Sequence, residues 1–140
     1  MPQLERILYV EDQLDIQMIA RIALERVGKF TVHICSSGAE ALAAVDEFSP
    51  DLLLLDVMMP DMDGPETLRR LKLRDELRNT PAIFMTAKVR ADEVAALHAA
   101  GAIDVIAKPF DPMTLAQTIR TMWARAQTQT SARSQNLATG

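Results

Sequence analysis

Residues 51–64 read DLLLLDVMMPDMDG, in which four consecutive leucines run directly into an aspartate and a loop rich in Met, Pro and Asp. A short apolar run without alternation is typical of a strand that is buried on both faces, as in a parallel sheet covered by helices. Asp56 then stands at the carboxyl end of that strand, the edge where open α/β sheets hold their functional groups. The stretch therefore predicts a fold class and one residue of a site.

Apolar runs and helical segments alternate along the rest of the chain, which predicts a parallel α/β sheet with helices on both faces. The predicted strands cover residues 6–10, 31–35, 52–55, 82–85 and 103–107. Helices are expected over residues 16–27, 37–48, 64 to about 77, 91–100 and from 112 onward, each with a capping residue, a glycine or a proline at one end. We thus expect five strands and five helices.

Two other predicted strand ends also carry ionisable side chains. Glu11 and Asp12 follow the first strand, and Lys108 follows the fifth. Because the carboxyl ends of parallel strands meet in one crevice, these groups should surround Asp56. Three crowded carboxylates raise the pKa of at least one of them unless a cation relieves the repulsion, and Mg²⁺ prefers such oxygen ligands. The pattern predicts an Asp56 nucleophile beside Mg²⁺, with Lys108 facing phosphoryl oxygens.

Length, charge and composition limit the class of protein. The chain has 140 residues, of which 49% are hydrophobic, so we expect one domain with a full core. Its net charge of −4 disfavours direct binding to nucleic acid. The sequence has no signal-peptide or bilayer-spanning run, so we expect no membrane contact and a cytoplasmic location. Residues 127–140 lack apolar periodicity, so we expect a disordered tail and no output domain after the sheet.

Several separated motifs resemble the receiver domain of two-component response regulators over residues 4–126. They are Val10-Glu11-Asp12, the stretch over 55–64, Met85-Thr86-Ala87-Lys88, Gly101-Ala102 and Lys108-Pro109-Phe110. The resemblance implies a flavodoxin-like, doubly wound sheet with strand order 2-1-3-4-5. It also implies Mg²⁺-dependent phosphorylation of one aspartate by a histidine kinase or a histidine phosphotransfer protein, and a switch that changes protein binding. No catalysis is implied beyond the chain's own phosphorylation and dephosphorylation.

The resemblance also assigns roles to single residues. Asp56 is the phosphoacceptor, and the backbone carbonyl of Met58 joins Glu11, Asp12 and Asp56 around the metal. Lys108 and the Thr86 hydroxyl contact the phosphoryl group. One position departs from the family pattern: three residues before the lysine, where many receivers carry an aromatic ring that moves with the threonine, this chain has Val105. The switch therefore has to work without a swinging ring.

Other functions remain open at the level of the sequence. A phosphorelay intermediate or a phosphate sink without its own output would carry the same motifs. A haloacid-dehalogenase-like phosphatase places a general acid two residues after its nucleophile, where this chain has Met58, which cannot transfer a proton. A flavodoxin-like flavin binder offers hydroxyls and amides in its first loop, where this chain has Glu11 and Asp12. Both enzyme-like and flavin-binding functions are therefore disfavoured.

The first helix carries more apolar residues than one buried face requires. Leu14, Met18, Ile19 and Ile22 lie outside its core-facing positions. Two explanations are open. Neighbouring helices cover these residues, or they form a docking patch for a helix of a kinase or a phosphotransfer protein beside the phosphorylation site.

Overall fold

The computed structural model describes the backbone of residues 3–139 and the side chains of residues 3–129. Its centre is one sheet of five parallel strands in the order β2-β1-β3-β4-β5. The strands are β1 (Arg6–Val10), β2 (Thr31–Cys35), β3 (Leu52–Asp56), β4 (Ala82–Thr86) and β5 (Asp104–Ala107). This confirms the flavodoxin-like strand order and the position of each predicted strand.

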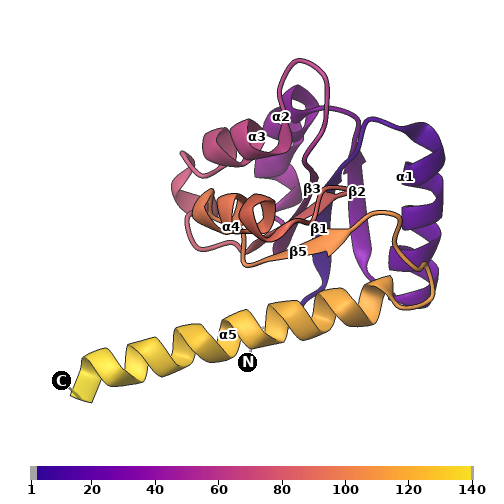
Figure 1. The fold of residues 1–140 in the computed structure, drawn as a ribbon. Coiled ribbons are helices and arrows are strands. Elements are labelled where there is room, and N and C mark those ends of the chain that lie inside the picture. The colour runs from indigo at the N-terminus through magenta and orange to yellow at the C-terminus, as the bar shows by residue number, and fades with distance from the viewer. Residues whose placement is uncertain (1–2, 140) are drawn as a thin grey trace.

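Helices cover both faces of the sheet (Figure 1). One face carries α2 (Gly38–Phe48), α3 (Gly64–Leu71) and α4 (Ala91–Ala99), and the other carries α1 (Leu14–Arg21), its continuation η1 (Ile22–Val27) and α5 (Leu115–Thr139). A short 3₁₀ turn, η2 (Asp75–Leu77), precedes β4. The five predicted helices are therefore present.

The four leucines of β3 divide between the two cores. Leu52 and Leu54 pack in the cluster with α1 and α5, whereas Leu53 and Leu55 pack in the cluster with α2, α3 and α4. All four are fully buried, as expected of a central strand covered on both faces. Asp56 is the next residue of the same strand. The alternation along β3 thus brings a carboxylate to the carboxyl edge of the sheet.

The third helix is shorter than the sequence predicts. It ends at Leu71 instead of near residue 77, and a separate 3₁₀ turn follows. Lys72 holds this turn, since its ammonium donates hydrogen bonds to the carbonyls of Leu77 at 2.9 Å and of Thr80. Leu77 is buried in this turn. The sequence therefore keeps the apolar spacing of a helix as far as residue 77, although the α-helix itself has already ended.

The last helix differs from the expectation of a disordered tail over 127–140. The structure continues α5 as one helix to Thr139. No proline or glycine interrupts residues 127–139, and Ala, Arg and Gln in that segment favour helix. Gly140 lies outside the described residues. Among the residues described, no helix is long and apolar enough to cross a membrane.

Candidate functional site

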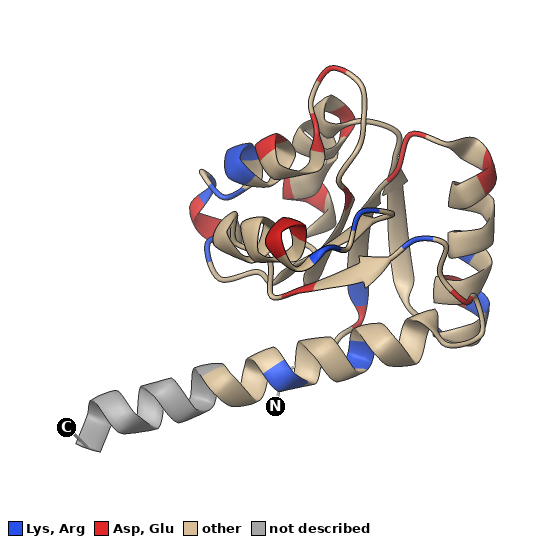
Figure 2. Ribbon diagram, in the orientation of Figure 1, with Lys and Arg blue, Asp and Glu red and all other residues tan. Residues whose placement is uncertain are grey.

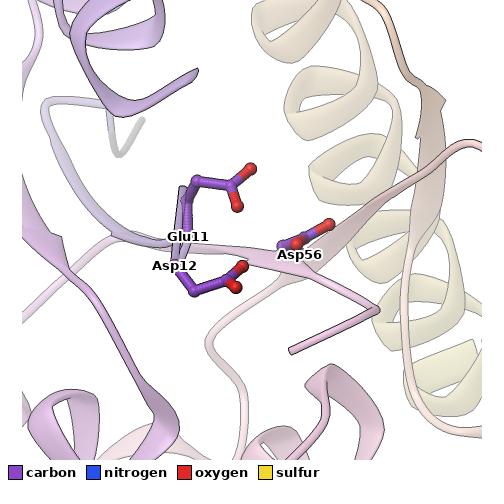
Figure 3. Close-up of side chains that lie close together, drawn as sticks. All are labelled: Glu11, Asp12 and Asp56. Carbon is purple, nitrogen blue, oxygen red and sulfur yellow. The ribbon is translucent and has the colours of Figure 1, made fainter. Parts of the chain in front are cut away.

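Three predicted acidic residues meet at the carboxyl edge of the sheet. Glu11 and Asp12 follow β1, and Asp56 ends β3, the strand beside it. One carboxylate oxygen from each lies within 4.8 Å of the others, and Figure 3 shows the three side chains together. Asp56 is only 4% exposed, and Glu11 is fully buried. The parallel register therefore concentrates negative charge at one place on this edge.

Lys108 joins this cluster from β5. Its Nζ donates a hydrogen bond to Glu11 Oε1 at 2.8 Å and to Asp56 Oδ1 at 3.1 Å. Both ion pairs are largely shielded from water, so each is stronger than an exposed pair would be. Two negative charges of the ionised cluster remain unbalanced. The four predicted ionisable residues are thus brought together.

Burial sets the protonation behaviour of this cluster. It raises the pKa of Glu11, the nearby Asp56 raises it further, and the hydrogen bond from Lys108 opposes both. Burial lowers the pKa of Lys108, but its hydrogen bonds to Glu11 and Asp56 outweigh this, so that its pKa is raised overall. Lys108 therefore stays charged at neutral pH, as a partner of phosphoryl oxygens must.

The carboxylates also fit a magnesium ion. Asp12 Oδ1 is buried and accepts no hydrogen bond from the described residues, although buried oxygens normally have a partner. Glu11 uses both of its oxygens, because Oε1 accepts from Lys108 and Oε2 accepts from the Gln13 amide at 3.2 Å. Asp56 has one oxygen on Lys108. Asp12 and the second oxygen of Asp56 are thus the free ligands, and Glu11 is suited to contact through water.

Thr86 ends β4, and Met58 follows the end of β3 by two residues. Thr86 is the buried last residue of β4, and its Oγ1 accepts a hydrogen bond from the Lys88 amide at 3.0 Å. Its carbonyl accepts from the Lys108 amide at 2.9 Å. Met58 lies in the loop after β3 with its side chain exposed. The contact of the Thr86 hydroxyl with a phosphoryl group and that of the Met58 carbonyl with a metal stay predictions.

Two residues support the site although nothing in the sequence pattern indicated this role for them. The side-chain amide of Gln17 donates a hydrogen bond from Nε2 to the carbonyl of Glu11, which fixes the start of the loop after β1 against α1. Gly64 lies so close to the end of β3 that an added Cβ would be 2.4 Å from the carbonyl oxygen of Asp56. The sequence gives Gly64 only as a helix start, but the loop from Asp56 to α3 can fold back this tightly only without a side chain there.

The raised pKa of Glu11 leads to a prediction for stability. A carboxyl whose pKa is raised on folding stabilises the native state at pH values below its ordinary pKa of 4.5. This stabilisation is lost as the pH rises through the pKa that the carboxyl has in the folded protein. In chelator, the unfolding free energy of Glu11→Gln should therefore fall less between pH 4.5 and 7 than that of the wild type. The slope should differ by at most about 1.4 kcal/mol per pH unit. Urea unfolding at each pH measures this, and parallel slopes would contradict it.

Val105 has the location that a passive side chain would have. It pairs with Phe84 across β4 and β5 and packs, partly buried, against the core beside α2, α3 and α4.

Over the whole domain, acidic and basic residues are interspersed among the helices and loops, and the view in Figure 2 shows no face of one sign.

Comparisons with known proteins agree with this geometry. A family model for the response regulator receiver domain matches residues 7–120. The transcriptional regulatory protein TrcR of Mycobacterium tuberculosis is 37% identical over 122 residues, which are 86% of this chain and 46% of TrcR. The phosphate regulon transcriptional regulatory protein PhoB of Rhizobium meliloti is 37% identical over 124 residues, 89% of this chain and 54% of PhoB. The chain spans about half the length of these curated relatives.

Solved structures show the same likeness. The chemotaxis protein CheY4 of Vibrio cholerae superposes with a TM-score of 0.79 at 28% identity, covering 86% of this chain and 99% of CheY4. The receiver domain of a signal transduction histidine kinase from Syntrophus aciditrophicus gives 0.73 at 32% identity, covering 86% of this chain and 90% of that one. Sequence, fold and acidic cluster agree, and the chain belongs to the family of response regulator receiver domains.

Proposed function

We propose that this chain accepts a phosphoryl group on Asp56 from a histidine kinase or a histidine phosphotransfer protein and signals through altered protein binding. One observation carries the proposal. Asp56 is buried at a sheet edge, with the Lys108 ammonium at 3.1 Å and beside Asp12, whose Oδ1 accepts no hydrogen bond from the described residues. That arrangement suits a nucleophilic carboxylate whose product carries additional negative charge.

The transfer step follows from these positions. One carboxylate oxygen of Asp56 attacks phosphorus, and the bond between phosphorus and the donor's imidazole nitrogen breaks. The nitrogen keeps the electron pair and takes a proton from water. Lys108 stabilises the charge on the phosphoryl oxygens, and the Thr86 hydroxyl donates to one of them after transfer. Mg²⁺, held by Asp12, Asp56 and the Met58 carbonyl with Glu11 acting through water, would neutralise further phosphoryl charge.

A small phosphodonor tests the acceptor directly. With acetyl phosphate and Mg²⁺, the protein should gain one phosphoryl group that is stable in acid and labile in base, as an acyl phosphate is. Mass spectrometry of the digested protein should locate it on Asp56, and chelation of Mg²⁺ should prevent its formation. A label on any other residue would contradict the assignment.

Removal of a proposed metal ligand separates metal affinity from fold. Asp12→Asn should weaken Mg²⁺ binding by tenfold or more, on the order of 1.4 kcal/mol. The variant without metal should be as stable as the wild type or more stable, because a charge that repels Glu11 and Asp56 has been lost. Thermal melts with and without Mg²⁺ measure both effects. If the Mg²⁺-dependent rise in melting temperature is unchanged, Asp12 is not a ligand.

Thr86 and Val105 separate two accounts of the switch. Thr86→Ala should still accept phosphate, because Asp56, Lys108 and the metal ligands remain, but it should not move the loop that Thr86 holds through Lys88. Val105→Ala should change the response much less, since it only shortens a packed side chain. Amide chemical shifts across residues 88–110, with and without beryllofluoride, measure the response. A full response in Thr86→Ala with none in Val105→Ala would reverse this account.

We propose signalling through protein contacts and not through direct nucleic-acid binding, which is supported by the net charge of −4. The chain acts on no other substrate in this proposal, since Met58 offers no proton to a leaving group. A role as a phosphorelay intermediate uses the same chemistry. The buried free thiol of Cys35 supports a cytoplasmic location.

A further inference from the structure

The outer surface of α1 and η1 carries most of the exposed large apolar side chains. Of nine such side chains among the residues described, five belong to this helix: Leu14, Met18, Ile19, Ile22 and Val27. The explanation that neighbouring helices cover Leu14, Met18, Ile19 and Ile22 is therefore wrong. Figure 1 shows α1 at the outer edge of the molecule, away from α2, α3 and α4. Apolar surface of this kind marks an interaction.

Two unpaired charges of opposite sign lie at the ends of this apolar surface. Asp15 and Arg26 are exposed, and neither forms a salt bridge within residues 3–129. By contrast, Arg21 and Glu25 neutralise each other at 3.0 Å on the same helix. The free charges are thus acidic at the beginning of the helix and basic at its end.

Asp15, Ile19, Ile22 and Arg26 form what we call the α1 stripe. Its steps of four, three and four residues keep these side chains on adjoining turns of the exposed side. η1 is a π-helix, whose turn is wider than that of α1. The arrangement is preserved because four residues approach one turn in both helix types. The steps are the same when read from either end, and the two ends carry opposite charge. A second α1 stripe in antiparallel orientation therefore matches the first, with Ile19 opposite Ile22 and Asp15 opposite Arg26.

We infer that the α1 stripe binds the α1 stripe of a second copy of this chain about a two-fold axis. A two-fold axis makes each contact occur twice, so two Asp15–Arg26 pairs enclose four isoleucines. A parallel arrangement would instead place like charges together. One helix pair is small compared with the roughly 1,200–2,000 Å² of stable interfaces. The dimer should therefore be weak, with a Kd on the order of 100 µM. The inference does not depend on phosphorylation of Asp56.

Sedimentation of the full chain tests this inference. From about 5 to about 500 µM, a range that brackets the expected Kd, the average mass should rise from 15.5 kDa toward twice that value. Ile22→Glu should remain monomeric, because it brings two carboxylates into the centre of the interface. Leu73→Glu is the matched control, since Leu73 is 73% exposed and lies outside α1. Its association should equal that of the wild type, and circular dichroism should show both variants folded.

Charge reversal tests the orientation. Asp15→Arg and Arg26→Asp should each weaken association about tenfold, as two attractive pairs become repulsive. The double variant restores both pairs with reversed signs and should recover the wild-type Kd. A wild-type protein that stays monomeric at all concentrations would overturn the inference, and would leave the apolar face for a different partner such as a kinase helix. A dimer that persists in Ile22→Glu, or a double variant that does not recover, would overturn the proposed interface.

Discussion

Asp56→Asn should abolish phosphorylation by acetyl phosphate and Mg²⁺, with a loss of at least about 100-fold in the rate of label incorporation. The amide that replaces the carboxylate is uncharged and cannot serve as the nucleophile. The fold should persist, because Asn fills the same volume at the end of β3. Loss of the contact with Lys108 is opposed by relief of repulsion from Glu11 and Asp12. The unfolding free energy should therefore change by no more than about 1 kcal/mol.

The matched control for this variant is Asp61→Asn. Asp61 is an exposed aspartate in the loop that follows β3, so the same chemical change is made outside the carboxylate cluster. It should incorporate phosphate at the wild-type rate. Intact-protein mass spectrometry over time measures both variants. If Asp56→Asn is labelled like the control, the phosphoacceptor is a different residue and the proposed function fails.

Lys108→Met should have the second largest effect, because it removes the only cation among the four residues of the buried cluster. The rate of phosphorylation should fall roughly 10²- to 10³-fold, as expected when a positioned charge on the reacting oxygens is lost. Without metal, the unfolding free energy at neutral pH should fall by about 2–4 kcal/mol, since two buried carboxylates lose their partner. Mg²⁺ should restore part of this stability.

The loss of stability in Lys108→Met should also depend on pH. The hydrogen bond from Lys108 lowers the pKa of Glu11, so its removal raises that pKa further. The native state then binds a proton more tightly than the unfolded chain. The unfolding free energy of the variant should accordingly approach that of the wild type as pH falls toward 4.5, and should fall further below it as pH rises.

Lys88→Met provides the control for the removal of a lysine. Lys88 is exposed in the loop after β4, and its replacement should change the unfolding free energy by less than about 0.5 kcal/mol. Urea unfolding in chelator at pH 5 and pH 7.5 distinguishes the two variants. Equal stability of Lys108→Met and Lys88→Met at the higher pH would show that the ion pairs of Lys108 contribute nothing to folding.

The sequence by itself determined the strands and the edge at which the site lies. Four leucines followed by Asp56 are typical of a strand buried on both faces, and the other apolar runs repeat that pattern. Since parallel strands end on one edge, it followed that Glu11, Asp12, Asp56 and Lys108 would converge. The strands and their common edge could be predicted because the residue types within each short segment indicate whether it forms a buried strand, and their order shows which residue stands at its carboxyl end.

The tertiary structure alone decided how these groups share their hydrogen bonds. Glu11 and Lys108 are 97 residues apart, and their pairing at 2.8 Å depends on the order and register of β1, β3, β4 and β5. That pairing leaves Asp12 Oδ1 and the second oxygen of Asp56 without a hydrogen bond from the described residues. The same holds for the outer face of α1, whose apolar residues look like core in the sequence. A sequence shows that a residue is apolar, but only the packing of distant segments determines whether anything covers it.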